Sequence, residues 1–208
     1  MKFYYNPLSP NSRRAWATIN HLELTNKVEA IVVEMSKGEH MKPEFLAMNP
    51  NHKVPVLVDG DFKLWESAAI MTYLCEMTPN QKLWGSTPRL RADTMRWMSW
   101  HLAHFGQAVG TYNWEYAFKP MQKQTPDMAL IEKAAVDFHK FAPVLNAHLE
   151  NKKWLVNEEL SLADFYIGAG FQFEPMSKLP LENYPHIRAW HTRLMAIPSW
   201  AKTAPKLG

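Results

Sequence analysis

The hydrophobic periodicity of this chain changes character once, near residue 78, and this change limits the folds that the chain can adopt. Before that point, short runs of β-branched and aromatic residues alternate with helical patterns in the order β-α-β-α-β-β-α. After it, only helical periods follow. We therefore predict an α/β domain over residues 1–78, a linker with two prolines and a glycine over 79–88, and an all-α domain over 89–208.

The individual elements are predicted from their period and from the turn residues between them. In the first part we expect strands over 2–5, 28–34, 54–58 and 62–65, and helices over 12–22, 43–48 and 67–77. Asp59-Gly60, between the last two strands, is a strong hairpin signal. In the second part we expect helices over 89–118, with a break after Gly110, and over 126–150, 161–173 and 184–196.

The composition excludes several classes of protein. With 47% hydrophobic and 21% charged residues among 208, the chain is neither disordered nor a coiled coil. Its net charge of +3 is spread without a dense basic block, so we expect no nucleic-acid partner. The single Cys75 excludes a disulfide framework and fits a reducing cytoplasm. No stretch reaches about 18 apolar residues, so we expect no membrane partner and a cytoplasmic location.

The pair Val54-Pro55 opens an apolar strand at a point where proline cannot donate a ladder hydrogen bond. A cis peptide bond is a natural candidate at such a bend. It would leave the backbone N–H and C=O of Val54 free to pair with an extended, peptide-like ligand. The alternative is an ordinary trans bond, which most X-Pro pairs adopt.

Glu66 and Ser67 lie where the next helix begins. A helix N-terminus offers free N–H groups and about half a positive charge, so with the Ser67 hydroxyl it makes a carboxylate site. Glu66 is able to pair with an ammonium group. The two together fit the end group of an α-amino acid. The alternative is that Ser67 only caps the helix while Glu66 favours its dipole.

Two loops before the Val54-Pro55 bend carry cationic and hydrogen-bonding side chains. His40 and Lys42 lie in the first loop, and Lys53 ends the second. These side chains are candidates to hold a second carboxylate at the far end of the same ligand. The alternative is a solvated loop, which is the usual environment of lysine.

Ser9 follows the first strand and precedes the first helix, in the run SPNSRRAW. A hydroxyl at this place, with the helix amides beside it, suits the stabilisation of an anion. The alternative is helix capping, for which Ser9, Asn11 and Ser12 are all suited. No His or Asp at triad-like spacing accompanies Ser9, so we exclude a hydrolase and predict a hydrogen-bond donor.

In this order the motifs resemble those of the cytosolic glutathione transferases. The likeness is strongest in GEHMKPEFLAMNPNHKVPVLVDGDFKLWESAAIMTYL, residues 38–74. SPNSRRAW is similar to the serine-type start of the phi and tau classes, and a bacterial member with a class of its own fits as well. In the helical half, Ser161-Leu162-Ala163-Asp164 looks like the family's capping box, and residues 184–199 look like its late-helix pattern.

The resemblance implies a thioredoxin-like N-terminal domain, an all-α C-terminal domain, a homodimer and glutathione as co-substrate. Ser9 would donate to the glutathione sulfur, with Asn11 or Ser12 as the next candidates, and Asn11 would lie in the glutathione site. The remaining site residues would contact the three parts of the tripeptide. Glu66 and Ser67 would hold the γ-glutamyl end, Val54 at the Val54-Pro55 turn the cysteinyl residue, and His40 with Lys53 and Lys42 the glycyl carboxylate.

Two positions depart from related phi sequences, which often have Lys beside the His and Gln before Val-Pro. Here those positions are Met41 and Lys53. Lys42 is able to substitute for the lysine one position later. We therefore expect carboxylate binding to survive with altered geometry.

We expect the pocket for the electrophile to lie between the domains. Its candidate lining residues in the helical half are Phe105, Asn113, Trp114 and Tyr116. His101 and His104 have a spacing seen in metal sites, but no third ligand is evident, so we interpret them as structural and expect no metal.

These residues are compatible with three functions. The first is a glutathione transferase acting on small hydrophobic electrophiles. The second is a non-catalytic binding module of the same fold, which would have no need of Ser9, Glu66 and Ser67. The third is a thiol-disulfide or peroxide-reducing protein, which would favour a Cys where Ser9 stands. The retention of all three site residues favours the transferase.

Overall fold

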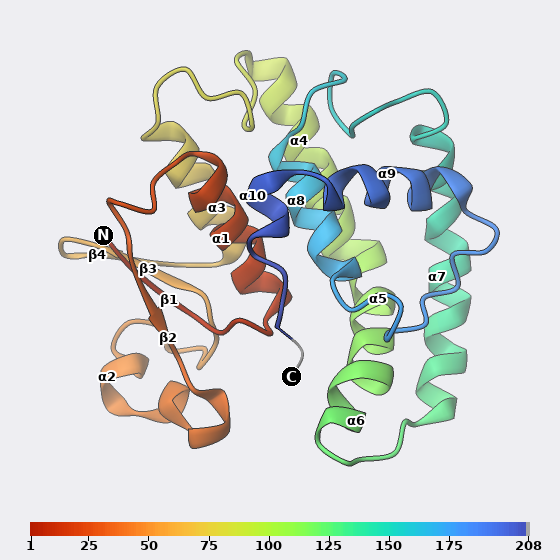
Figure 1. The fold of residues 1–208 in the computed structure, drawn as a ribbon, viewed down its shortest axis with the longest axis horizontal. Coiled ribbons are helices and arrows are strands. Elements are labelled where there is room, and N and C mark those ends of the chain that lie inside the picture. The colour runs from red at the N-terminus through yellow and green to blue at the C-terminus, as the bar shows by residue number, and fades with distance from the viewer. Residues whose placement is uncertain (207–208) are drawn as a thin grey trace. The chain divides into compact units, whose positions relative to one another are not determined.

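The computed structural model describes residues 1–206, which form two compact units (Figure 1). The first unit consists of Met1–Trp84 together with the segment from Ile197 onward, and the second of Gly85–Ala196. This division differs from the predicted domains 1–78 and 89–208, because the last segment groups with the first unit. Helical periodicity does not reveal with which unit a short terminal helix packs.

The first unit is built on a four-stranded sheet with the order β2-β1-β3-β4. β1 (Lys2–Tyr5) pairs in parallel with β2 (Glu29–Val32) and antiparallel with β3 (Val56–Asp59), and β4 (Phe62–Trp65) is antiparallel to β3. The four predicted strands and the Asp59-Gly60 hairpin are confirmed.

Helices cover the two faces of this sheet. α1 (Pro10–His21) and α3 (Ser67–Glu76) contact each other beside the sheet (Figure 1). Side chains alternate along β1, so Phe3 and Tyr5 both stack on Trp16 of α1. Tyr4 points the other way and packs on the core cluster that contains Phe45. Phe45 belongs to α2 (Pro43–Leu46), which follows two short 3-10 turns, η1 (Met35–Lys37) and η2 (Glu39–Met41).

The terminal segment returns to α1 through a short helix, α10 (Pro198–Ala201). The guanidinium of Arg13 lies 4.0 Å from the centroid of the Trp200 ring, and Trp200 is completely buried. This contact explains why the segment groups with the first unit.

The second unit begins with a continuous helical run over residues 88–121. It consists of α4 (Pro88–Trp100), α5 (Gly106–Asn113) and α6 (Lys119–Met121), joined by two π-helical turns, η3 (His101–Phe105) and η4 (Trp114–Phe118). The predicted break after Gly110 is wrong, because Gly110 lies inside α5 and the helix continues past it. The irregularities are π turns on either side, where one residue is inserted without ending the helix.

The remaining helices of the second unit are α7 (Met128–His148), α8 (Leu162–Gly168) with the 3-10 turn η5 (Ala169–Phe171), and α9 (Pro185–Met195). The predicted capping box is confirmed at α8. There the buried Asp164 accepts hydrogen bonds from the N–H of Ser161 at 2.8 Å and the Trp190 indole at 2.9 Å. Asp164 therefore ties the start of α8 to α9. None of the helices within residues 1–206 is long and apolar enough to cross a membrane.

Candidate functional site

The predicted site residues of the first unit come from segments that meet at one end of the sheet. Val56, at the start of β3, pairs with Tyr4 of β1 on one side and with Trp65 of β4 on the other. Because β3 is antiparallel to both neighbours, the loop after β1, the turn before β3 and the start of α3 lie at the same sheet end. The register therefore brings Ser9, Val54 and Glu66 to one region of the fold.

Ser9 is the N-cap of α1. Its hydroxyl oxygen accepts a hydrogen bond from the backbone N–H of Ser12 at 3.3 Å. The alternative interpretation, that Ser9 caps the helix, is therefore confirmed. A hydroxyl has one proton to donate in addition to its acceptor lone pairs, so capping leaves the O–H for another acceptor. No acidic residue lies in the first turn of α1, so no side-chain charge opposes an anion there.

Asn11 and Ser12, the two other candidates for thiol activation, are already engaged. The Ser12 hydroxyl accepts from the backbone N–H of Asn6 at 3.2 Å and is 1% exposed. The Asn11 side-chain oxygen accepts from the Arg14 guanidinium at 2.6 Å, and Asn11 is exposed. Ser9 is half-buried whereas Ser12 is buried, so accessibility of the hydroxyl distinguishes Ser9 from Ser12, and the possession of a hydroxyl distinguishes it from Asn11.

The Val54-Pro55 bond is cis, as the sequence predicts. Within residues 1–206, neither the N–H nor the C=O of Val54 takes part in a backbone hydrogen bond. Pro55 is buried and Val54 is 7% exposed, packed in the same cluster as Phe45 of α2. An unpaired backbone group at a sheet end is a place where an extended ligand adds hydrogen bonds.

The loop before this turn is held by Asn49, a residue that the sequence analysis did not assign. Its side-chain amide donates to the carbonyl of Lys53 at 2.7 Å, and its oxygen accepts from the N–H of Asn51 at 3.0 Å. Asn49 is 3% exposed, so these bonds satisfy a buried polar group. The Asn-Pro-Asn pattern was the available signal, because Asn readily bonds to nearby backbone in turns.

Glu66 and Ser67 form the start of α3. Glu66 is the N-cap, with a φ of 71° and a ψ of 116°, and its side chain makes no capping hydrogen bond. The alternative that Ser67 caps the helix is wrong, because Ser67 is the first helical residue and is 5% exposed. The first N–H groups of this ten-residue helix therefore have no side-chain cap. They form the helix N-terminus, where the binding of an anion is favourable. A non-glycine residue at this φ is strained, and such strain concentrates at functional sites.

His40, Lys42 and Lys53 lie in the loops around α2 and before β3. His40 is half-buried in η2, and its Nδ1 is buried without a hydrogen-bond partner. Lys42 and Lys53 are exposed, and the neighbouring Met41 is 54% exposed. The two ammonium groups carry positive charge in the loops that flank the cis turn.

The other reactive groups that the sequence contains are unsuited to catalysis. Cys75 is 1% exposed inside α3, and burial raises the pKa of its thiol to about 12, so the thiol stays protonated. Within residues 1–206 no cluster of three His, Cys, Asp or Glu side chains is arranged to hold a metal ion. His101 is buried, as expected of a structural residue.

The four predicted pocket residues of the second unit have different environments. Phe105 is completely buried and packs against Phe138 with ring centroids 5.0 Å apart, so it is a core residue and not a lining residue. Asn113 is also buried, and its amide donates to the Gly170 carbonyl at 2.8 Å. Trp114 is 48% exposed and Tyr116 is half-buried, so these two remain accessible.

Comparison with family models gives two matches along the chain. Residues 3–82 match the model of the glutathione S-transferase N-terminal domain. Residues 111–198 match the model of the glutathione S-transferase C-terminal domain. The two matched segments fall in the α/β part and in the helical part of the chain.

Individual relatives are similar over almost the full length. A probable glutathione S-transferase of Oryza sativa subsp. japonica is 33% identical over 98% of this chain and 95% of its own. A disulfide-bond oxidoreductase of Escherichia coli is 31% identical over 94% of this chain and 90% of its own. A solved structure of glutathione S-transferase-I bound with lactoylglutathione has a TM-score of 0.86 at 28% identity, covering 98% and 97% of the two chains.

Proposed function

Because this chain belongs to the glutathione S-transferase family, we propose that the sheet end around Val56 binds glutathione and that Ser9 activates its thiol. The chain is a glutathione transferase with glutathione as co-substrate. The observation that carries the proposed site is the register at Val56, which brings three segments to one sheet end.

Three groups of residues bind the tripeptide in this proposal. Glu66 pairs with the γ-glutamyl ammonium, while Ser67 and the uncapped amides of α3 bind the carboxylate of the same residue. The free N–H and C=O of Val54, at the cis bond to Pro55, pair with the cysteinyl residue. His40, Lys53 and Lys42 bind the glycyl carboxylate, and Asn11 lies at the edge of the site. The unpartnered Nδ1 of His40 supports a ligand contact there.

Thiol activation follows from the position of Ser9 at the start of α1. A cysteine thiol has a pKa of about 8.5, and lowering it by about two units requires about 2.7 kcal/mol of preferential thiolate stabilisation. A charge-assisted hydrogen bond from the Ser9 hydroxyl supplies about 1.5–3 kcal/mol. The N-terminus of α1 adds about 0.3–1 kcal/mol. The sum reaches the required value without a metal ion or a general base.

The thiolate then attacks an electrophilic carbon held beside it. The sulfur electron pair forms the new C–S bond, the leaving group departs with the electrons of the broken bond, and the thiol proton has already passed to solvent. Small hydrophobic electrophiles suit this step, and the accessible Trp114 and Tyr116 are the residues of the second unit that we expect to contact them.

A second candidate activity is glutathione-dependent disulfide reduction, which the name of the Escherichia coli relative favours. Cys75 takes no part in it, because its thiol is buried and protonated. Bound glutathione thiolate would attack one sulfur of a disulfide, and a second glutathione would resolve the mixed disulfide. The products are two thiols and one glutathione disulfide, so the electrons balance.

We also infer a serine-type enzyme, a homodimer and a cytoplasmic location. The Ser9 hydroxyl proton, which is available for donation, supports the assignment as a serine-type enzyme. Exposed aromatic side chains on the edge strand β4, Phe62 at 48% and Trp65 at 39%, support a partner that covers them. The single, buried cysteine fits a reducing compartment. Light scattering of wild type and of Phe62→Asp tests the dimer, which the substitution should weaken.

The experiment that tests the function is a pH titration of thiolate absorbance with glutathione bound to the protein. A thiol pKa well below that of free glutathione, together with conjugation of chlorodinitrobenzene, supports the transferase. Reduction of hydroxyethyl disulfide without conjugation would favour the second candidate. Tight binding with an unshifted thiol pKa would identify a binding module without catalysis.

A further inference from the structure

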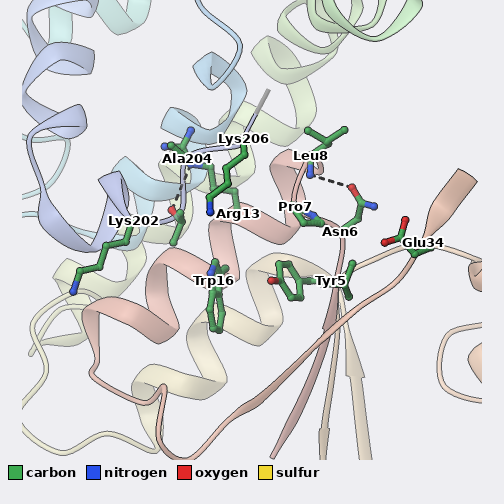
Figure 2. Close-up of a pocket in the computed structure, with 12 residues that line it drawn as sticks. Tyr5, Asn6, Pro7, Leu8, Arg13, Trp16, Glu34, Lys202, Ala204 and Lys206 are labelled. Carbon is green, nitrogen blue, oxygen red and sulfur yellow. Dashed lines mark hydrogen bonds between the residues drawn. The ribbon is translucent and has the colours of Figure 1, made fainter. Parts of the chain in front are cut away.

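Asn6 directly follows β1 and holds the loop that leads to Ser9. Pro7 and Pro10 have no N–H, so Leu8 and Ser9 supply the N–H groups between Asn6 and α1. Asn6 accepts both of them. Its side-chain oxygen accepts from the N–H of Leu8 at 3.0 Å, a bond that Figure 2 shows, and its carbonyl accepts from the N–H of Ser9 at 3.0 Å. The loop that carries Ser9 is therefore folded around one residue.

Asn6, Ser9 and Ser12 are joined in a closed ring of hydrogen bonds. The backbone N–H of Asn6 donates to Ser12 Oγ at 3.2 Å, and the N–H of Ser12 donates to the Ser9 hydroxyl oxygen at 3.3 Å. The bond from the Ser9 N–H to the Asn6 carbonyl completes the ring. A hydroxyl oxygen that accepts from a fixed donor has fewer directions left for its own proton. The ring thus limits the directions in which the Ser9 hydroxyl donates.

The side chain of Asn6 also joins this loop to the core beneath the cis turn. Its amide donates to the Val33 carbonyl at 3.0 Å, and the N–H of Val33 donates to the Tyr5 carbonyl at 2.8 Å. Val33 is 3% exposed and packs in the same core cluster as Val54. Asn6 therefore connects the loop that carries Ser9 with the cluster that contains Val54.

We propose that Asn6 is a positioning residue for thiol activation, which holds the Ser9 hydroxyl at a fixed place relative to the Val54 backbone. This inference rests on the proposed function, in which Val54 pairs with the cysteinyl residue and Ser9 donates to the sulfur of that same residue. A shift of Ser9 relative to Val54 would therefore lengthen the hydrogen bond to sulfur. A misplacement of about 1 Å costs up to about 100-fold in an enzymatic rate. Asn6 touches no reacting atom and acts through Ser9.

The test measures the thiolate absorbance of bound glutathione against pH in wild type, Asn6→Ala and Ser9→Ala. We expect Asn6→Ala to raise the thiol pKa toward that of free glutathione and to lower kcat at neutral pH about 5- to 50-fold. The KM for glutathione should change by less than about threefold, since the binding contacts lie elsewhere. Asn6→Ser should restore part of the pKa shift, because a serine hydroxyl accepts from the N–H two residues on in a similar turn.

A double variant and a matched control separate positioning from a general loss of structure. If Asn6 acts through Ser9, Asn6→Ala adds no further rise in the thiol pKa to Ser9→Ala, whereas independent effects of the two substitutions would add. Asn20→Ala is the control, because Asn20 is half-buried in the last turn of α1 and its amide donates to the Trp16 carbonyl at 2.8 Å. Asn20→Ala should lower stability in urea unfolding while the thiol pKa of bound glutathione stays at its wild-type value.

The outcomes distinguish this inference from the proposed function. A wild-type thiol pKa in Asn6→Ala, where Ser9→Ala raises it, would overturn the role of Asn6 and leave that of Ser9 intact. A low thiol pKa that persists in Ser9→Ala would overturn the role of Ser9 and the role of Asn6 with it. Should Asn6→Ala fail to fold, Asn6→Ser, alone and combined with Ser9→Ala, gives the same comparison.

Discussion

The Ser9 hydroxyl oxygen lies 3.3 Å from the backbone nitrogen of Ser12 and accepts its hydrogen bond. One hydroxyl thus caps α1 with its oxygen and keeps its proton for a ligand. Helix capping and thiol activation are therefore compatible roles of Ser9. They are lost together when the hydroxyl is removed, and the measurements that detect them are different.

Ser9→Ala is expected to lower turnover about 10- to 100-fold, because a charge-assisted hydrogen bond to the thiolate is removed. The dissociation constant of glutathione should change by less than about threefold, since the binding contacts lie elsewhere. The thiol pKa of bound glutathione should rise toward its free value. Steady-state kinetics, calorimetry and thiolate absorbance measure the three quantities.

Ser9→Thr is the matched control, because it keeps a hydroxyl and a good N-cap. It should retain most of the activity and the lowered thiol pKa. Ser9→Ala should also lose about 0.5–2 kcal/mol of unfolding free energy through the lost cap. If Ser9→Ala turned over as fast as wild type, the activator would be sought at Asn11.

Glu66→Gly and Glu66→Gln are expected to separate backbone strain from ligand binding. Both remove the carboxylate, so both should weaken glutathione binding about tenfold or more through loss of a charge pair. Only glycine relaxes the backbone at a φ of 71°, so Glu66→Gly should be about 1 kcal/mol more stable than Glu66→Gln. Urea unfolding and calorimetry measure the two effects.

Glu29→Gln serves as the control for this pair. Glu29 is exposed at the start of β2, opposite Lys2, and therefore at the far end of the sheet from Val56. Its substitution should leave glutathione affinity unchanged. Equal glutathione affinity in wild type and both Glu66 variants would remove Glu66 from the site.

Asn49→Ala is expected to raise the KM for glutathione with a smaller effect on kcat, because Asn49 positions the loop that precedes Val54. It should also cost about 1–3 kcal/mol of stability, since buried partners lose their hydrogen bonds. Asn49→Asp keeps the acceptor for Asn51 but places a carboxylate oxygen against the Lys53 carbonyl at a buried position. It should recover neither the stability nor the KM, and a full recovery of both would argue against the Lys53 contact.

The unfolding free energy is expected to depend on Cys75 in alkaline solution. Its folded pKa is about 12 and its unfolded value is 9.0, so the unfolded chain releases a proton that the folded chain keeps. The thiol's contribution is complete below pH 9 and declines as the pH rises toward 12, at up to about 1.4 kcal/mol per pH unit. Urea unfolding of wild type and Cys75→Ala at several pH values gives this slope by difference. Parallel curves for the two proteins would contradict it.

The sequence was sufficient to predict the strands and most helices of both units. The strand patterns predicted β1 and β4 with their observed bounds, and the helical period of 3.6 predicted the helices. The Asp-Gly pair located the hairpin between β3 and β4. Two features escaped prediction. The π turns at 101–105 and 114–118 keep a helical pattern, so periodicity does not distinguish them from an α-helix. The pairing of α10 with α1 depends on a contact across the chain, between Arg13 and Trp200.

The candidate site was predictable where local chemistry sufficed. The start of α3 at Ser67 was predicted from neighbouring residues, and the cis bond at Pro55 and the capping role of Ser9 were each one of two alternatives that the sequence offered. The role of Asn49 depends on burial, and the strained φ of Glu66 depends on how β4 joins α3, so neither is visible in a residue pattern. Phe105 was misassigned because an aromatic residue on a helix gives no sign of which face is buried.

The grouping of the segment from Ile197 onward with Met1–Trp84 has a consequence for biosynthesis. During translation Met1–Trp84 emerges first and Gly85–Ala196 second, and Trp200, the ring on which Arg13 packs, is synthesised after both segments. The α/β unit therefore remains incomplete, with Arg13 lacking its contact to Trp200, until the whole helical unit has left the ribosome. The order of synthesis means that residues made after the helical unit complete the unit that was begun before it.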